Sequence, residues 1–230
     1  MQGYQVKFED YRIDGRDYRI RSLRDRQQYP AACDEGEHPG VSAANWPLFG
    51  VIWPSGQMLA RHMSTYAVDG LRILEVGCGL ALASIVLRGR GADITASDHH
   101  PMMPSFLAAN LALNALRDID TIAGEWASEE ADPELFDLII GADLLYERDH
   151  FSMLSAFIDR HAKPVAEVII VDPGRGYAGK FGRRMQALGY SCTQERSEMQ
   201  LADHETFAGR IVTCRRDPGG NGVAKGMFPV

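Results

Sequence analysis

The stretch that decides the fold is 71-LRILEVGCG-79. Its first six residues, 71–76, are mostly aliphatic and predict a short strand buried on both faces of a sheet. A turn containing two glycines follows, and residues 80–87 then form an apolar segment that predicts a helix. A strand, a glycine-rich turn and a helix in this order are typical of the first unit of a parallel α/β sheet.

The same alternation continues along the chain. Further strands are predicted at residues 92–96, 119–122, 136–140 and 165–171. Helices are predicted at residues 57–63, 102–116, 151–158 and 179–188. Two late strands, at residues 190–193 and 207–214, have no helix between them, which indicates an antiparallel ending. We therefore expect an α/β fold with a Rossmann-like, doubly wound, mostly parallel seven-stranded sheet and an antiparallel C-terminal strand.

The N-terminal residues follow a different pattern. Residues 4–23 alternate between apolar and polar side chains around Asp14-Gly15, which predicts a β-hairpin extension. Residues 29–45 are rich in proline, glycine and small polar side chains and predict a loop. The expected organisation is a hairpin and linker over residues 1–45, a ligand-binding domain over 46–216 and a flexible tail over 217–230.

Composition limits the classes of function. The chain has 230 residues, 24 basic against 31 acidic, and a net charge of -7, which disfavours broad nucleic-acid binding. No apolar run is long enough to span a membrane. The four cysteines are scattered without a CxxC pair, so a structural metal site is not expected. These features predict a soluble, cytoplasmic monomer with reduced cysteines.

The residues at the strand ends predict a cofactor site. Gly77 and Gly79 allow close approach of a ligand to the backbone at a helix N-terminus. Asp98 ends the next strand, where a carboxylate can accept both hydroxyl protons of a ribose. Two details disfavour a dinucleotide. Leu82 stands where the dinucleotide-binding fingerprint has a small residue, and Glu75 suits a ligand amino group better than a pyrophosphate. A ligand with a ribose, a purine and an amine but no phosphate matches S-adenosylmethionine.

These motifs resemble the class I, seven-strand S-adenosylmethionine-dependent methyltransferases. Trp53-Pro54-Ser55-Gly56 and Asp143-Leu144-Leu145-Tyr146 are similar to the branch that contains protein lysine methyltransferases, with relatives acting on protein histidine. The resemblance departs at Ala81, where that family often has a third glycine. Together with the strand-end argument, it implies a cofactor site of Trp53, Glu75, Gly77, Cys78, Gly79, Asp98, His99, Trp126 and Ala142.

The acceptor is expected at the end of the strand at residues 136–140. There the resemblance places Asp143 and Tyr146 beside the transferable methyl group as the catalytic residues. No Asn-Pro-Pro-Tyr motif follows this strand, which disfavours planar amide or nucleobase acceptors, and we expect a protein lysine side chain. The adjacent His99 and His100 are not expected to bind a metal, because neighbouring side chains point apart.

Three alternatives stay open at this point. A small-molecule methyltransferase would use the aromatic entrance of Trp46 and Trp53 to enclose a metabolite. A non-catalytic binding module of the same fold is disfavoured by the presence of Glu75 and Asp143. A nicotinamide-dependent oxidoreductase is the least favoured of the three, and titration with each cofactor would distinguish it from a methyltransferase.

Overall fold

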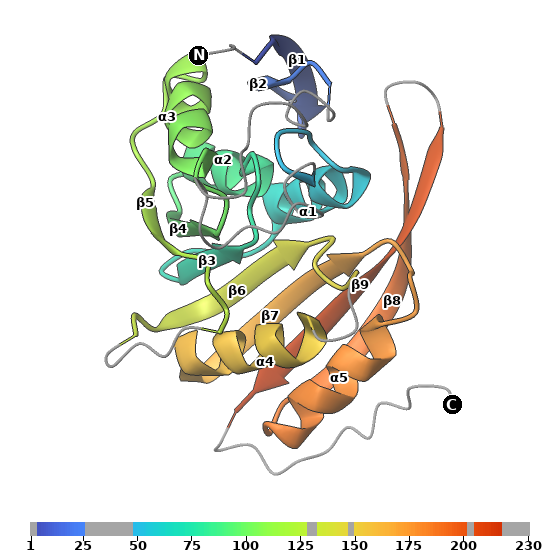
Figure 1. Cartoon of the computed structure of the whole chain (residues 1–230). Coiled ribbons are helices and arrows are strands. Elements are labelled where there is room, and N and C mark those ends of the chain that lie inside the picture. The colour runs from blue at the N-terminus through green and yellow to red at the C-terminus, as the bar shows by residue number, and fades with distance from the viewer. Residues whose placement is uncertain (1–3, 26–47, 128–132, 147–149, 202–204, 218–230) are drawn as a thin grey trace, which may run out of the picture.

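The computed structural model describes residues 4–25, 48–127, 133–146, 150–201 and 205–217 (Figure 1). The predicted loop at residues 29–45, Trp46 and the predicted tail after residue 217 lie outside these ranges. The three-part division of the chain therefore stays a prediction.

The main body is a seven-stranded sheet in the order β5-β4-β3-β6-β7-β9-β8. Its first five strands in this order are parallel, and β9 runs antiparallel to both of its neighbours. This confirms the predicted fold class. The strands are β3 (Arg72–Val76), β4 (Asp93–Asp98), β5 (Asp120–Ala123), β6 (Phe136–Ala142), β7 (Ala162–Asp172), β8 (Ser191–Gln200) and β9 (Thr206–Arg216).

Helices cover both faces of this sheet (Figure 1). They are α1 (Pro54–Thr65), α2 (Leu82–Gly89), α3 (Met103–Leu113), α4 (His150–His161) and α5 (Ala178–Ala187). The first three pack on one face around Ile73, Ile94 and Ile140, and the last two pack on the other around Ile139 and Val168. None of the described helices is long and apolar enough to cross a membrane.

Several predicted boundaries differ from the observed ones. Helix α2 begins two residues later than expected, because Ala81 takes a left-handed conformation with φ 59° and keeps the turn open. Strand β8 continues well beyond its predicted segment, whereas β9 exceeds its own by only one residue at the start and two at the end. The extension of β8 follows from its pairing with β9 along its whole length. Cross-strand pairing of this kind is set by tertiary contacts and is invisible to local hydrophobic periodicity.

The predicted N-terminal hairpin is present as β1 (Val6–Ile13) and β2 (Arg16–Leu23). Asn110 of α3 and Asn114, which caps the C-terminus of that helix, complete the outer edge of β2. Asn110 accepts from the Arg21 N–H at 2.7 Å and donates to its carbonyl at 3.3 Å, and Asn114 does the same for Arg19 at 2.9 and 2.8 Å. The two carboxamides act as a neighbouring strand would and attach the hairpin to the main body.

A disulfide joins Cys192 of β8 to Cys214 of β9. The expectation that the cysteines are reduced is therefore wrong for this pair. The two residues are 22 positions apart in sequence and become direct partners only through the antiparallel register of the two strands. Cys78 is a buried free cysteine, and Cys33 lies outside the described residues.

Candidate active site

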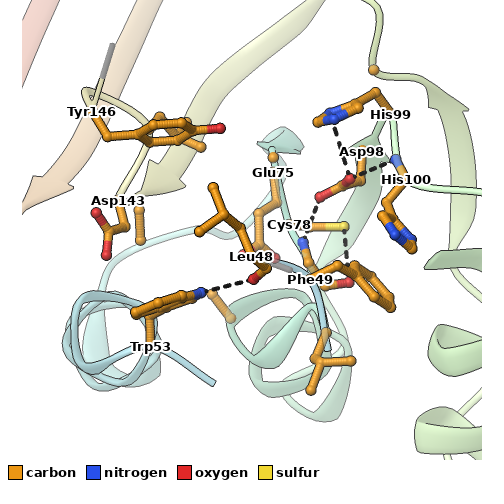
Figure 2. A pocket seen from close by; sticks show the side chains of 18 of the residues that line it. Leu48, Phe49, Trp53, Glu75, Cys78, Asp98, His99, His100, Asp143 and Tyr146 are labelled. Carbon is orange, nitrogen blue, oxygen red and sulfur yellow. Dashed lines mark hydrogen bonds and ion pairs between the residues drawn. The ribbon is translucent and has the colours of Figure 1, made fainter. Parts of the chain in front are cut away.

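A pocket of about 360 Å³ opens at the carboxyl ends of β3, β4, β5 and β6. This is the edge of a parallel sheet at which ligands bind in doubly wound folds. Figure 2 shows Asp143 and Tyr146 at one end, Asp98 and the two histidines at the other, and Glu75 and Cys78 between them. All the predicted site residues line it: Trp53, Glu75, Gly77, Cys78, Gly79, Asp98, His99, Trp126, Ala142, Asp143 and Tyr146.

The turn after β3 is shaped by close packing and left-handed backbone. Gly77 has φ 58°, and a Cβ built on it would lie 2.4 Å from a methyl carbon of Leu144. Ala81, where the resembled family often has glycine, also adopts φ 59°. Ala81 donates its N–H to the Cys78 carbonyl at 2.7 Å, so the turn closes on itself without a third glycine. Burial raises the pKa of the Cys78 thiol, which keeps it protonated.

Glu75 is buried at the end of β3, where it is 5% exposed. Its Oε2 accepts a hydrogen bond from the Ser84 N–H at 2.8 Å and another from the Ser84 hydroxyl. Both bonds fall on one oxygen, so the carboxyl anchors the start of α2 and still presents acceptor capacity to the pocket. Burial raises the pKa of Glu75 to about 7, although the Ser84 hydrogen bonds oppose the rise.

Asp98 is held by backbone amides on both carboxylate oxygens. Oδ2 accepts from the Gly79 N–H at 2.7 Å, and Oδ1 accepts from the His100 N–H at 2.8 Å. Gly124 allows the end of β5 to approach this turn, since a Cβ there would lie 2.4 Å from the Asp98 carbonyl carbon. Each carboxylate oxygen keeps a further lone pair, so Asp98 is oriented to accept hydroxyl protons from a ligand.

The two histidines point in different directions (Figure 2). His99 lies 3.8 Å from Asp98 Oδ1, whereas the buried His100 ring stacks on Phe49 with centroids 4.0 Å apart. Within the described ranges, no group of three or more His, Cys, Asp or Glu side chains is arranged to hold a metal ion.

Two tryptophans line the pocket. Trp53 precedes α1 and donates its indole N–H to the Leu48 carbonyl at 3.1 Å. Trp126 follows β5, and its carbonyl accepts a hydrogen bond from Arg160 at 3.0 Å. Both side chains are partly exposed, so their rings can contact a ligand as well as the protein core.

At the other end, Asp143 directly follows β6 in a left-handed conformation with φ 59°. Its N–H donates to the Val171 carbonyl at 2.9 Å, which binds this turn to β7. The side chain is 11% exposed and forms an ion pair with Arg175, which is 42% exposed. Burial raises the pKa of Asp143, and the positive charge of Arg175 opposes that rise. Tyr146 is partly buried and lies on the same side of the pocket.

Sequence reasoning missed several lining residues, chiefly Phe49, His100, Met153 and Arg175. Arg175 was detectable in principle. The sequence Asp172-Pro173-Gly174 ends a predicted buried strand, so the residues just after it belong to the same ligand-binding edge of the sheet. Phe49 gave no such signal, because its place depends on stacking against His100.

Comparison with known proteins agrees with this geometry. A family model described as lysine methyltransferase matches residues 45–180, which is more than half of the chain. The chain belongs to the lysine methyltransferase family. The matched range contains every predicted site residue and also Arg175.

Two curated relatives of this lysine methyltransferase family member share about a third of the aligned residues with it. The electron transfer flavoprotein beta subunit lysine methyltransferase of Xenopus laevis is 30% identical over 133 residues, covering 56% of this chain and 53% of that protein. The protein N-lysine methyltransferase METTL21A of Mus musculus is 31% identical over 121 residues, covering 48% and 55%. The chain thus spans about half the length of the curated relatives it matches.

Solved structures confirm the fold. The magnesium protoporphyrin IX methyltransferase of Synechocystis PCC 6803, solved with bound SAM, superimposes with a TM-score of 0.55 at 19% identity. The match covers 70% of this chain and 79% of that one. At this identity the likeness concerns the fold alone.

Proposed function

We propose that this protein is an S-adenosylmethionine-dependent methyltransferase that methylates a lysine side chain of a protein. The observation that supports this most is that one pocket joins Asp98, whose carboxylate oxygens keep lone pairs for ligand hydroxyls, to a second carboxylate, Asp143, whose side chain is only 11% exposed. Membership of the lysine methyltransferase family favours a protein lysine over a metabolite as the acceptor.

The residues present fit the proposed cofactor. Asp98 would hold the ribose hydroxyls, and Trp126 would lie against the purine. Glu75 is a deeply buried acid whose carboxyl faces a pocket, and the amino group of the cofactor would supply a cationic partner for it. Four carboxylates line the described pocket, namely Glu75, Asp98, Glu125 and Asp143, against a single arginine. This balance favours a ligand that carries positive charge.

When bound, S-adenosylmethionine supplies a methyl group already activated by a positively charged sulfur. The protein therefore has to position the acceptor and exclude water. The free amine of lysine has a pKa of about 10.4 and attacks only when neutral. We assign to Asp143 the role of accepting a hydrogen bond from the acceptor nitrogen, which orients its lone pair. Tyr146 would pack beside the aliphatic part of the acceptor.

The test is methylation in a host lysate. The purified protein and isotopically labelled S-adenosylmethionine are added to lysate from cells lacking the gene, and labelled species are separated by size. Label in one protein band supports the proposal if acid hydrolysis of that band releases the label as methylated lysine. Label confined to small molecules would instead identify a metabolite methyltransferase. If calorimetry detected no binding of S-adenosylmethionine, the result would favour the alternative that the protein is a non-catalytic binding module.

The beta subunit of electron transfer flavoprotein is the first protein to test as an acceptor, because the family relative from Xenopus laevis carries that name. We include it as a proposal about the substrate. The host's own subunit should acquire label with the wild-type enzyme and far less with Asp143→Ala.

The cytoplasmic location, the monomeric state and the exclusion of nucleic acid also stay predictions. The net charge of -7 supports the last of these. The Cys192–Cys214 disulfide favours an oxidising compartment over the cytoplasm. Counting free thiols in protein purified from its host under acid quench would decide whether this bond exists in cells.

A further inference from the structure

The ion pair between Asp143 and Arg175 occupies the carboxylate to which the proposed function assigns the acceptor amine. Arg175 lies in the turn after β7, and its guanidinium contacts Asp143 Oδ1. Both residues line the pocket. In this arrangement Arg175 holds the place of an incoming cation.

The two partners differ in how much they need each other. Asp143 is 11% exposed, so its carboxylate loses hydration and requires a cationic partner. Arg175 is 42% exposed, so its guanidinium can return to water at low cost. A second cation that enters the pocket can therefore replace Arg175 without leaving a buried charge unpaired.

The turn around Arg175 is built for such a movement. Gly174 and Gly176 flank it with φ 91° and 88°, and a Cβ on either would meet nothing within 4 Å. The turn is therefore open on both sides of Arg175, and its side chain can leave the pocket without repacking a core. Gly174 is also fixed to β7 by donating its N–H to Asp172 Oδ2 at 2.7 Å, so the base of the turn stays in place.

We propose that Arg175 is a specificity-determining gate, whose guanidinium pairs with Asp143 until the ammonium or amine of the acceptor displaces it. This inference rests on the proposed function, because it takes Asp143 as the acceptor-binding residue. The gate lowers the apparent affinity for any simple amine by the fraction of time that Asp143 is paired with Arg175. Only an acceptor with further contacts to the protein surface overcomes this cost readily.

In the part of the chain that the structure describes, Arg175 and Asp172 carry the charges that interact with Asp143. From β7, Asp172 faces it closely enough for the Asp143 charge to raise the pKa of the Asp172 carboxyl, although burial is the larger cause. The positive charge of Arg175 opposes the rise in pKa of both carboxyl groups. Removal of Arg175 should therefore act on Asp143 and Asp172 alone among the groups named here.

The test uses n-butylammonium as a probe, because it carries the charge and four-carbon chain of a lysine side chain. It is titrated into the full-length protein, with and without S-adenosylhomocysteine, while the NMR signal of the Arg175 Nε–H group is followed. This signal is assigned by its loss in Arg175→Gln. Its chemical shift in Asp143→Asn defines the guanidinium that has lost its ion pair. Neutral n-butanol is the matched control.

The gate predicts that saturating n-butylammonium moves the Arg175 signal to its Asp143→Asn position, and that n-butanol does not. Arg175→Gln should bind n-butylammonium about threefold to tenfold more tightly than the wild type. Arg175→Lys should stay close to the wild type. In the Asp143→Asn background, the gain from Arg175→Gln should vanish.

Two results overturn the gate. One is an Arg175 signal that stays in its paired position while the amine saturates the protein. The other is equal or weaker amine binding by Arg175→Gln. Failure of the proposed function looks different: Asp143→Asn would then bind n-butylammonium as well as the wild type, or S-adenosylhomocysteine would not bind at all.

Discussion

At the end of the pocket formed by β3 and β4, each carboxylate is held by neutral donors of nearby residues. Glu75 is bound by Ser84, and Asp98 is bound by the amides of Gly79 and His100. At the end formed by β6 and β7, Asp143 is instead paired with the charged and partly exposed Arg175. The first end is already oriented without a ligand, whereas the proposed gate would have the second end exchange one cation for another.

This difference follows from what each end must do. A cofactor of fixed structure is bound best by groups that are already oriented, because little conformational entropy is lost on binding. A site for one side chain on a large protein must instead reject free amines. The contrast can be tested by removing groups from each end and asking whether binding or turnover changes.

The largest effect is expected at the acceptor end, from Asp143→Ala. Loss of the group that orients the nitrogen should reduce the turnover number by about 100-fold or more, because positioning accounts for most of the catalysis. Cofactor affinity should stay within about threefold, because Asp143 lies at the far end of the pocket from Asp98 (Figure 2). Label transfer and calorimetry measure the two quantities. Asp120→Ala, an exposed aspartate at the start of β5, is the control. Turnover equal to that of the control would exclude Asp143 from the mechanism.

At the cofactor end, Asp98→Ala should act on binding. The substitution leaves the Gly79 and His100 amides without their acceptor and removes the ribose partner, so the dissociation constant should rise about 10-fold to 100-fold. Asp118→Ala is the control, because it removes an exposed carboxylate just before β5 and should leave cofactor affinity unchanged. A variant that binds the cofactor normally but turns over slowly would reverse the proposed division between the two ends.

The two ends also differ in how far they could be predicted from sequence. Glu75 and Asp98 lie at the ends of two consecutive strands, and Gly77 and Gly79 lie in the turn after the first of them. Their spacing alone indicates a ribose-bearing ligand. All of them line one pocket, and their contact with a cofactor stays a prediction. The hydrogen-bond partners were not foreseeable, because Ser84 reaches Glu75 only through the turn at Ala81.

At the acceptor end, sequence identified Asp143 and missed Arg175. The reason is physical: the ion pair joins Asp143, after β6, to Arg175, which lies 32 residues later and after β7. The sequence indicates where β7 ends, but no local pattern encodes the contact between the two turns. The Cys192–Cys214 pair escaped for the same reason, since it depends on strand register. Local motifs thus report the groups that one turn of chain brings together, and contacts between turns must be observed.

The pKa of Glu75, about 7, predicts how cofactor binding depends on pH. A positively charged ligand favours the carboxylate, so binding below pH 7 must first remove a proton from Glu75. Affinity should therefore rise as the pH increases from 6 to 8, by up to about tenfold, and binding should release protons. Glu75→Gln should show only the titration of the ligand itself. Calorimetry in two buffers of different ionisation enthalpy measures the released protons, and identical proton release by both proteins would contradict the prediction.

The same group predicts a dependence of stability on pH in the unliganded protein. The folded-state pKa lies above the unfolded value of 4.5, so Glu75 stabilises the folded state below that value and this stabilisation is lost as the pH rises to about 7. Relative to Glu75→Gln, the wild type should lose free energy of unfolding between pH 4.5 and 7. Urea titrations of both proteins at pH 5 and pH 8 give the comparison. A difference that grows with pH in favour of the wild type would show the opposite sign.

The smallest effect on binding is expected from the hairpin, which supports the cofactor end from outside. Leu23 of β2 donates its N–H to the Gly50 carbonyl at 2.7 Å, next to the pocket-lining Phe49. The hairpin itself is attached through Asn110, which is fully buried and bonded to both backbone groups of Arg21. Asn110→Ala should therefore cost about 1–3 kcal/mol of unfolding free energy, because a partly buried N–H and carbonyl lose their partner.

Cofactor affinity should follow only weakly, by a fewfold at most, because Asp98 and Glu75 keep their own donors when the hairpin loosens. Asn114→Ala is the matched control. It removes the same carboxamide at the C-cap of α3, four residues later, but its partner Arg19 is exposed and water can substitute there. Thermal unfolding and limited proteolysis of the hairpin distinguish the two variants. If Asn110→Ala abolished cofactor binding while the main body stayed folded, the cofactor end would depend on the hairpin, and its own hydrogen bonds would not be enough to prepare it for the ligand.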